Sequence, residues 1–190
     1  MNSLLRLGKF SISLPVALTG FLGYFIHSPE PAIPLWLTVT GVFLLAMASS
    51  ALNQVVERKT DALMERTSSR PLPAGELTLS QALWFIVLSA LCGTVLLLRT
   101  GSWLPAALGL FTMAWYILVY TPLKRMTAFA VFPGALTGAM PPLIGWTAAG
   151  GSPLEREILM VSFFLFVGQM PHYWLLLIRY GREFQEAGLP

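Results

Sequence analysis

The stretch PAIPLWLTVTGVFLLAMASSALNQVVERKTD, residues 31–61, contains the two features that decide the fold of this chain. Residues 31–56 include no Asp, Glu, Lys or Arg, and the run is longer than the roughly 20 residues that an α-helix needs to cross a bilayer. The last part of the stretch, residues 53–61, adds an amide and two carboxylates. The pattern predicts a membrane-spanning helix whose polar end lies at a membrane surface.

Five further runs lack charged residues, namely 10–26, 77–98, 100–123, 126–154 and 158–178. Only 11% of the chain is charged and 55% is hydrophobic, whereas an ordinary soluble domain has about 25% charged residues. The mean hydropathy is +0.68. These values predict an all-α, polytopic transmembrane helix bundle of about six spans, which we interpret as one domain over residues 1–190. The lone Cys92 lies inside a predicted span, where we expect a small buried residue.

The basic residues alternate between the two sides of such a bundle. One side has Arg99 and Arg156, and the other has the remaining ten, in the N-terminal flank, the second loop, the fourth loop and the C-terminal tail. By the positive-inside rule, the basic side faces the cytoplasm. We therefore expect a bacterial-type inner membrane protein with both termini in the cytoplasm. The net charge of +3 reflects this orientation and does not indicate nucleic-acid binding.

Asn53, Glu57 and Asp61 are spaced four residues apart, so a helix places all three side chains on one face. Hard oxygen ligands of this kind suit Mg²⁺, which commonly shares its coordination with substrate phosphates. A second acidic pair, Glu183 and Glu186, lies in the tail on the same side of the membrane. We expect a Mg²⁺ site at the cytoplasmic face.

Four basic residues accompany these acidic groups on the cytoplasmic side: Arg66, Arg70, Lys124 and Arg125. Cations beside bound Mg²⁺ would clamp the oxygens of a diphosphate and stabilise the charge that develops when it leaves. An apolar pocket inside the bundle would hold a polyisoprenoid chain. Gly134 and Gly138, at small-xxx-small spacing in the run 126–154, predict a closely packed helix beside that cavity. The sequence therefore predicts a membrane enzyme that handles a diphosphate at the bilayer surface.

Several motifs along the chain resemble those of the UbiA-type membrane prenyltransferases, and most closely those of the protoheme IX farnesyltransferase branch. They occur in order along nearly the whole chain: Asp61 with Met64-Glu65-Arg66-Thr67 and Arg70-Pro71-Leu72-Pro73; Tyr120-Thr121-Pro122-Leu123-Lys124-Arg125; Gly138-Ala139-Met140-Pro141-Pro142-Leu143-Ile144-Gly145-Trp146; Pro171-His172-Tyr173-Trp174; and Glu183-Phe184 with Ala187-Gly188-Leu189-Pro190.

The resemblance implies transfer of the farnesyl group of farnesyl diphosphate to a vinyl carbon of heme b, giving heme O and diphosphate. It implies that Mg²⁺ and diphosphate are held by Asn53, Glu57 and Asp61, the first acidic motif, together with Glu183. Glu186 is included only because it lies close to Glu183 in the sequence. Arg66, Arg70, Lys124 and Arg125 would bind the phosphate oxygens. His172 would contact the tetrapyrrole. Proteins that assemble terminal oxidases are further candidate partners, and the lipid bilayer is the expected surroundings.

The chain departs from the family pattern in two respects. Glu57 and Glu183 stand where the family prefers Asp, which keeps the charge but lengthens the side chain by one methylene group. The sequence also ends just after the second acidic motif, where family members continue with further helices, so we expect the domain to be incomplete at its C-terminal end.

Three alternative functions remain open at this point. The chain is compatible with a UbiA-type prenyltransferase that uses a quinone precursor or another ring as acceptor. It is also compatible with a non-catalytic, heme-handling assembly factor descended from such an enzyme. A transporter is disfavoured, because the Asp and Glu residues cluster at the ends of the spans rather than within them.

Overall fold

The computed structural model describes residues 2–186, without the side chains of residues 128, 172, 176, 177 and 179–186. All regular structure in this part of the chain is helical, which confirms the predicted fold class. The elements in order are α1 (Ser3–Leu7), α2 (Phe10–His27), α3 (Ile33–Asp61), α4 (Glu65–Ser68), α5 (Leu79–Leu98), α6 (Leu104–Trp115), the π-helical turn η1 (Tyr116–Tyr120), α7 (Thr121–Leu123), the 3₁₀ turn η2 (Ala128–Ala130), α8 (Val131–Ala148) and α9 (Arg156–Glu186).

Local sequence signals explain where the long helices begin. Thr78 caps α5 by accepting a hydrogen bond from the backbone N–H of Gln81, whose own side chain accepts from the backbone N–H of Thr78. Pro34 and Pro105 occupy the first turns of α3 and α6, where the missing backbone N–H costs no helical hydrogen bond. The long spans therefore start at residues suited to that position.

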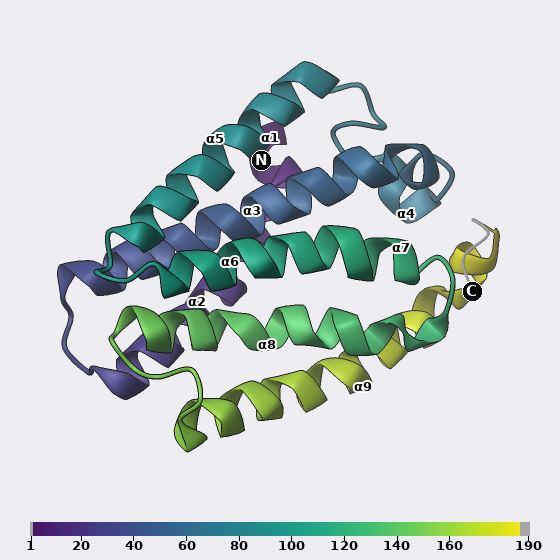
Figure 1. Ribbon diagram of the computed structural model, residues 1–190. Coiled ribbons are helices and arrows are strands. Elements are labelled where there is room, and N and C mark those ends of the chain that lie inside the picture. The colour runs from purple at the N-terminus through teal and green to yellow at the C-terminus, as the bar shows by residue number, and fades with distance from the viewer. Residues whose placement is uncertain (1, 187–190) are drawn as a thin grey trace.

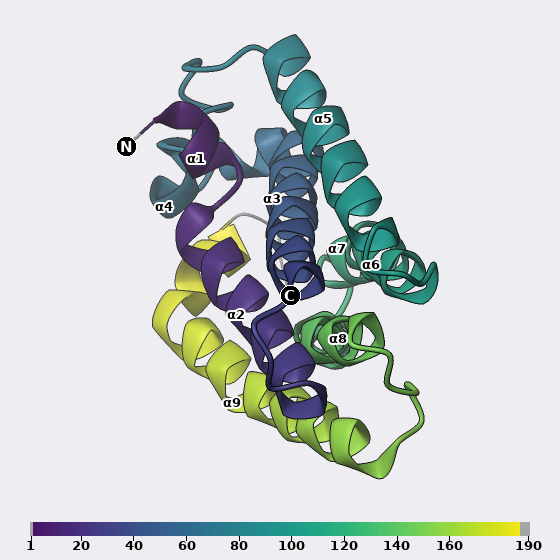
Figure 2. The same ribbon diagram turned by 90° about the vertical axis from the view of Figure 1, so that its left-hand side faces the viewer.

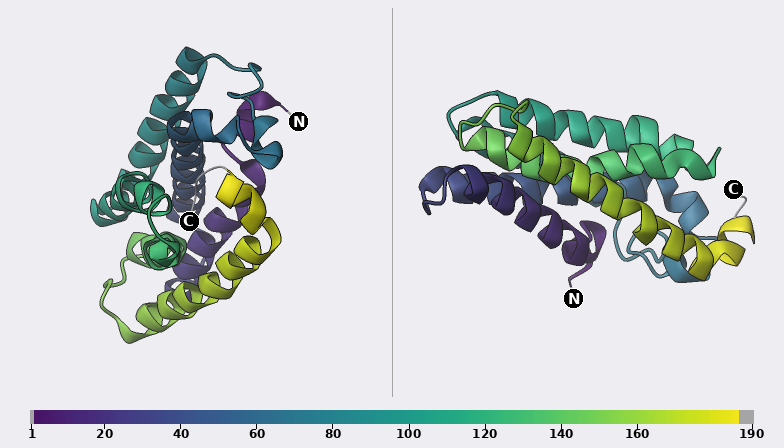
Figure 3. Two further views of the ribbon diagram at one scale, coloured as in Figure 1. Left: turned by 90° about the vertical axis from the view of Figure 1, so that its right-hand side faces the viewer. Right: turned by 90° about the horizontal axis from the view of Figure 1, so that it is seen from below.

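The long helices run back and forth across the bundle. Figure 1 shows α5, α3, α6, α8 and α9 in succession, with α2 behind them. Helix α3 packs on α5 and α2, while α8 packs on α2, α6 and α9. Figure 2, viewed roughly along α3, shows the short helices α1 and α4 on the same side of the bundle. Figure 3 shows that α9 crosses the bundle and ends on the side of α4. The polar connections expected at the cytoplasm thus share one end of the molecule.

Five helical segments in the described part of the chain are long and apolar enough to cross a membrane: Phe10–His27, Ile33–Asp61, Leu79–Leu98, Leu104–Leu123 and Arg156–Leu175. The sixth predicted span corresponds to α8, whose Gly and Pro residues lower its hydropathy. Eleven of its 18 residues are buried, because α2, α6 and α9 surround it. The prediction of about six spans therefore agrees with the structure.

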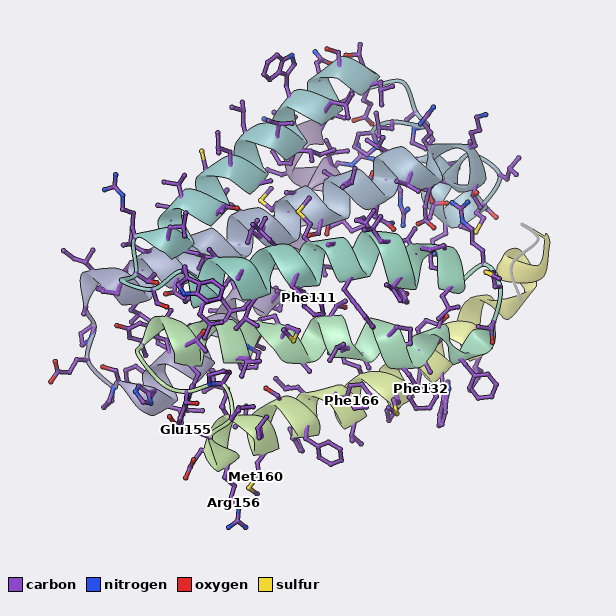
Figure 4. The ribbon with its side chains drawn as sticks, in the orientation of Figure 1. Phe111, Phe132, Glu155, Arg156, Met160 and Phe166 are labelled. Atoms are coloured by element: carbon purple, nitrogen blue, oxygen red, sulfur yellow. The ribbon has the colours of Figure 1, made fainter. Side chains whose placement is uncertain are left out.

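The outer surface of the bundle carries many large apolar side chains. Phe163, Phe164 and Ile178 on α9 are all more than two-thirds exposed. Figure 4 shows Met160 and Arg156 pointing away from the bundle at the start of this helix. Cys92 on α5 is exposed as well, so the expectation of a buried cysteine was wrong. A membrane protein can present such residues to lipid, which removes the usual penalty for exposing them.

Helices α2 and α8 lie in close backbone contact. A Cβ atom on Gly23 would overlap the backbone of Pro142, and one on Gly145 would overlap the backbone of Gly20. Gly134 and Gly138 were predicted to allow close packing, and they make room for side chains instead. Gly134 lies against the ring of Tyr120, and Gly138 lies against Gln169 of α9. Small residues of α8 thus bring α2 close on one side and leave space on another.

Candidate functional site

The last turns of α3 form the centre of the site. Asn53, Glu57 and Asp61 are 1%, 7% and 2% exposed, although two of them carry charge. They lie on one face of the helix, as their spacing predicts, and Asn53 Nδ2 donates a hydrogen bond of 2.7 Å to Glu57 Oε2. Buried carboxylates require partners, because burial of an unpaired charge is costly. The chain supplies these partners from two loops.

Asp61 is paired with Arg70, which follows α4. Arg70 NH1 lies 2.6 Å from Asp61 Oδ2. The loop is fixed beside Asp61 by Thr67, whose hydroxyl donates to the Asp61 backbone carbonyl at 2.8 Å. Arg66 lies in α4 beside Thr67, and its side chain is exposed. The predicted placement of a basic group beside the first acidic motif therefore holds for Arg70.

Glu57 is paired with the residues that follow α7. Lys124 Nζ lies 2.8 Å from Glu57 Oε1 and also donates to Glu57 Oε2 at 2.8 Å. Arg125 is more distant, with 3.9 Å between Arg125 NH2 and Glu57 Oε1. Residues nearly 70 positions apart in the sequence thus meet at one end of the bundle, as the predicted topology requires.

Thr121 connects the two halves of the site. Its hydroxyl lies 3.0 Å from Asn53 Oδ1 and 2.9 Å from the backbone carbonyl oxygen of Tyr116. The π-helical turn η1 immediately precedes Thr121, and π-turns of this kind often occur at functional sites. The motif around Thr121 can be seen in the sequence, but it does not predict that the Thr121 side chain contacts Asn53.

Lys9 is a further residue of the site, although in the sequence it indicates only the topology. It joins α1 to α2 in the left-handed conformation, with φ at 48°, which residues other than glycine seldom adopt. Buried Gln54 fixes this turn by donating to the backbone carbonyls of Leu7 at 2.8 Å and Arg6 at 3.2 Å. Lys9, Gln54 and Arg70 line a small pocket of about 240 Å³.

The surroundings of Lys9 lower its pKa to about 8. Burial is the largest cause, and the cations Arg70 and Lys124 add to it, while Glu57 and Asp61 act in the opposite direction. The pKa of Lys9 therefore depends on charged residues throughout the cluster. A basic residue directly before a predicted span was the signal that could have identified it.

An apolar cavity of about 640 Å³ lies deeper in the bundle. Residues of α2, α3, α6, α8 and α9 line it. Two of its lining residues lie close in sequence to the charged cluster: Ser50 shortly precedes Asn53, and Tyr116 shortly precedes Thr121. Gly134 and Gly138 line it too, in agreement with the predicted cavity beside their helix. The arrangement joins a charged end to an apolar interior, which suits an amphiphile with an anionic head.

The donor set fits Mg²⁺ shared with phosphate oxygens. Mg²⁺ is commonly held by one or two carboxylates together with waters and substrate phosphates, and Asn53, Glu57 and Asp61 supply two carboxylates and an amide. Among the described residues, no group of three or more His, Cys, Asp and Glu side chains is placed to hold a metal by itself.

Three predicted residues lie outside the described side chains, namely His172, Glu183 and Glu186. The backbone of α9, on which all three lie, is described and ends on the same side of the bundle as α4 and α7 (Figure 1). The structure thus brings six of the predicted residues together in one cluster: Asn53, Glu57, Asp61, Arg70, Lys124 and Arg125.

The fold is similar to solved structures of UbiA homologues. A UbiA homologue from Archaeoglobus fulgidus, solved bound to GPP and Mg²⁺, superposes with a TM-score of 0.81 at 16% identity, over 99% of this chain and 67% of that chain. A digeranylgeranylglyceryl phosphate synthase superposes with a TM-score of 0.78 at 17% identity, over 98% of this chain and 66% of that chain. At this level of identity, the likeness concerns the fold alone.

The sequence is similar to that of several curated proteins. A protoheme IX farnesyltransferase of Geobacter sulfurreducens is 47% identical over 158 residues, which cover 82% of this chain and 57% of the relative. One from Solibacter usitatus is 36% identical over 200 residues, covering 100% of this chain and 68% of the relative. The chain thus spans well under the full length of these relatives. The model of the UbiA prenyltransferase family matches residues 13–190. This chain therefore belongs to the UbiA prenyltransferase family.

Proposed function

We propose that this chain forms the diphosphate site and prenyl cavity of a protoheme IX farnesyltransferase. The reaction transfers the farnesyl group of farnesyl diphosphate to a vinyl group of heme b, giving heme O and diphosphate. The observation that carries the proposal is the cluster of buried carboxylates and cations at one end of an apolar cavity. The 47% identity to the Geobacter sulfurreducens relative supports heme b as the acceptor.

The residues of the first acidic motif, with Glu183 and Glu186 of α9, would hold Mg²⁺. The cation supplies positive charge that stabilises the departing diphosphate. Arg70 and Lys124 are already placed beside the carboxylates, at 2.6 Å and 2.8 Å, and would transfer their hydrogen bonds to phosphate oxygens. Arg66 and Arg125 would add further contacts at the rim of the site.

The bond changes follow from this arrangement. The carbon–oxygen bond of the allylic diphosphate breaks, and its electron pair leaves with the diphosphate oxygen. The π electrons of the heme vinyl group then form a bond to the farnesyl carbon. Water adds to the remaining cationic carbon and releases a proton. The apolar cavity protects the allylic cation from early capture by water.

The same proposal assigns the remaining predicted roles. His172 would contact the tetrapyrrole from α9. The protein would lie in the cytoplasmic membrane of a bacterium with its charged end in the cytoplasm, where both termini would also lie. Assembly proteins of terminal oxidases would receive the product.

The test uses membranes that contain the chain, supplied with Mg²⁺, farnesyl diphosphate and heme b. Extracted hemes are analysed by mass spectrometry, with EDTA and Asp61→Ala as controls. We expect a heme that has gained a farnesyl group and the elements of water, absent from both controls. Product formed only when a quinone precursor replaces heme b would contradict the assigned acceptor.

A chimera makes the test independent of the length of the chain. The matching segment of the Geobacter sulfurreducens relative is replaced by this chain, and the rest of the relative is kept. Heme O formation by the chimera, lost on Asp61→Ala, would support the proposal. A folded chimera that binds farnesyl diphosphate but leaves heme b unchanged would contradict it.

A further inference from the structure

The cavity extends away from the charged cluster along a single face of α3. Val42, Ala46 and Ser50 line it, and they share this face with Asn53 and Glu57 because they follow one another at helical spacing. At a rise of about 1.5 Å per residue, Val42 lies about 16 Å along the helix from Asn53. A chain whose head is bound at Asn53 would therefore extend toward Val42.

Three hydroxyl groups in the cavity walls have hydrogen-bond partners within the protein. Ser49 donates to the carbonyl of Leu45 at 2.8 Å, and Thr112 donates to the carbonyl of Leu108 at 2.7 Å. Thr137 donates to the carbonyl of Gly134 at 2.6 Å. Since these hydroxyls are satisfied within their own helices, the surface that they present suits a hydrocarbon.

The deep end of the cavity is closed by a packed cluster. Val42 and Ile144, each 3% exposed, line the cavity and pack with Leu45, Leu97 and Ala106. Leu97 is 0% exposed and does not line the cavity, so it supports the cluster from behind. Close packing of this kind leaves no space for additional atoms beyond Val42 and Ile144.

We propose that Val42 and Ile144 form a floor that limits the bound prenyl chain to three isoprene units. The inference rests on the proposed function, because that function places the diphosphate at Asn53, Glu57 and Asp61. A fourth isoprene unit that continued along α3 would have to displace the buried cluster. A chain of two units would leave the apolar surface of the floor uncovered.

Gly109 offers a way to raise the floor without disturbing the charged cluster. It lines the cavity, and a Cβ atom at this position would come within 2.6 Å of Leu45 Cδ1. Leu45 also lines the cavity, and its side-chain end can move into the open space. Gly109→Ala would thus shorten the cavity, whereas Val42→Ala and Ile144→Ala would deepen it.

The experiment measures which prenyl diphosphate the full chain binds from an equimolar mixture of geranyl, farnesyl and geranylgeranyl diphosphates with Mg²⁺ and without an acceptor. Bound ligands are identified by mass spectrometry after purification in detergent. We expect Val42→Ala and Ile144→Ala to raise the ratio of geranylgeranyl to farnesyl diphosphate by about tenfold, and Gly109→Ala to favour geranyl diphosphate.

Leu97→Ala is the matched control, because it removes the same kind of side chain from the same cluster without lining the cavity. It should lower thermal stability and leave the chain-length preference unchanged. An equal shift in Leu97→Ala, or an unchanged preference in both Val42→Ala and Gly109→Ala, would overturn the proposal. If the unmodified chain binds no prenyl diphosphate, the proposed function itself fails, and this inference fails with it. Binding without heme transfer would refute the acceptor alone.

Discussion

Arg70 forms an ion pair with Asp61, with 2.6 Å between Arg70 NH1 and Asp61 Oδ2. Lys124 forms an ion pair with Glu57 in the same way, with 2.8 Å between Lys124 Nζ and Glu57 Oε1. The two carboxylates of the first acidic motif are thus paired with cations of the chain. A cation that binds alone must compete with these ion pairs, which are partly shielded from solvent. A diphosphate would draw Arg70 and Lys124 toward its own oxygens and release the carboxylates.

We predict from this exchange that Mg²⁺ and prenyl diphosphate bind cooperatively. Mg²⁺ alone should bind weakly, and farnesyl diphosphate should raise its affinity about 10- to 100-fold, with the same factor in the reciprocal experiment. Isothermal titration calorimetry with an uncleavable farnesyl diphosphate analogue measures both affinities. Equal affinity of Mg²⁺ with and without the analogue would show that the ion pairs do not compete with the metal.

The variant Asp61→Asn should abolish prenyl transfer while preserving the shape of the side chain. It removes a metal ligand and leaves Arg70 without its partner, so we expect turnover to fall by at least about 100-fold. Glu65→Gln, an exposed carboxylate on the neighbouring α4, is the matched control and should keep full activity. Thermal unfolding of both variants separates loss of the site from loss of the fold. Retained turnover in a folded Asp61→Asn variant would exclude a metal role for Asp61.

The arrangement of the carboxylate cluster could be predicted from the sequence because it depends on two simple regularities. The spacing of four residues places Asn53, Glu57 and Asp61 on one helical face whatever the rest of the fold. The alternation of basic loops brings Arg70 and Lys124 to the same end of the bundle. Both relationships follow from helix geometry and membrane topology, so no knowledge of packing was needed.

Lys9 and Thr121 could not be predicted in the same way. Lys9 reaches the cluster because Gln54 holds the turn between α1 and α2, and this long-range contact leaves no local pattern. Thr121 meets Asn53 because the π-turn η1 changes the register of the preceding helix by one residue. Cys92 was placed wrongly since hydropathy alone does not tell which face of a span is turned outward.

The contact between Thr121 and Asn53 predicts a measurable role for the threonine hydroxyl. Thr121→Val keeps the shape of the side chain but leaves the buried Asn53 Oδ1 without this donor. We expect prenyl diphosphate affinity to weaken by about 1–3 kcal/mol, the usual penalty for an unsatisfied buried polar group. Thr38→Val is the control, because Thr38 is equally buried in α3 and donates only to the carbonyl of Pro34. The role of Thr121 would be excluded if both valine variants bound the ligand as the unmodified chain does.

The lowered pKa of Lys9 predicts opposite pH dependences for ligand affinity and for folding stability. Its pKa of about 8 lies below the ordinary value of 10.5, so Lys9 loses its charge as the pH rises through 8. Loss of that charge should weaken binding of farnesyl diphosphate, which is anionic. In the unfolded chain Lys9 keeps its proton up to about pH 10.5, so between these two values the folded state binds fewer protons, and folding stability should rise with pH.

Two variants isolate the contribution of Lys9 to these profiles. Lys9→Arg stays charged at all these pH values, so its affinity for farnesyl diphosphate should not show the decline above pH 8. Lys9→Met carries no charge and should bind weakly throughout, with a flatter dependence of stability on pH. Binding titrations and thermal unfolding at a series of pH values measure both quantities. A decline of the same size in Lys9→Arg would assign the titration to a group other than Lys9.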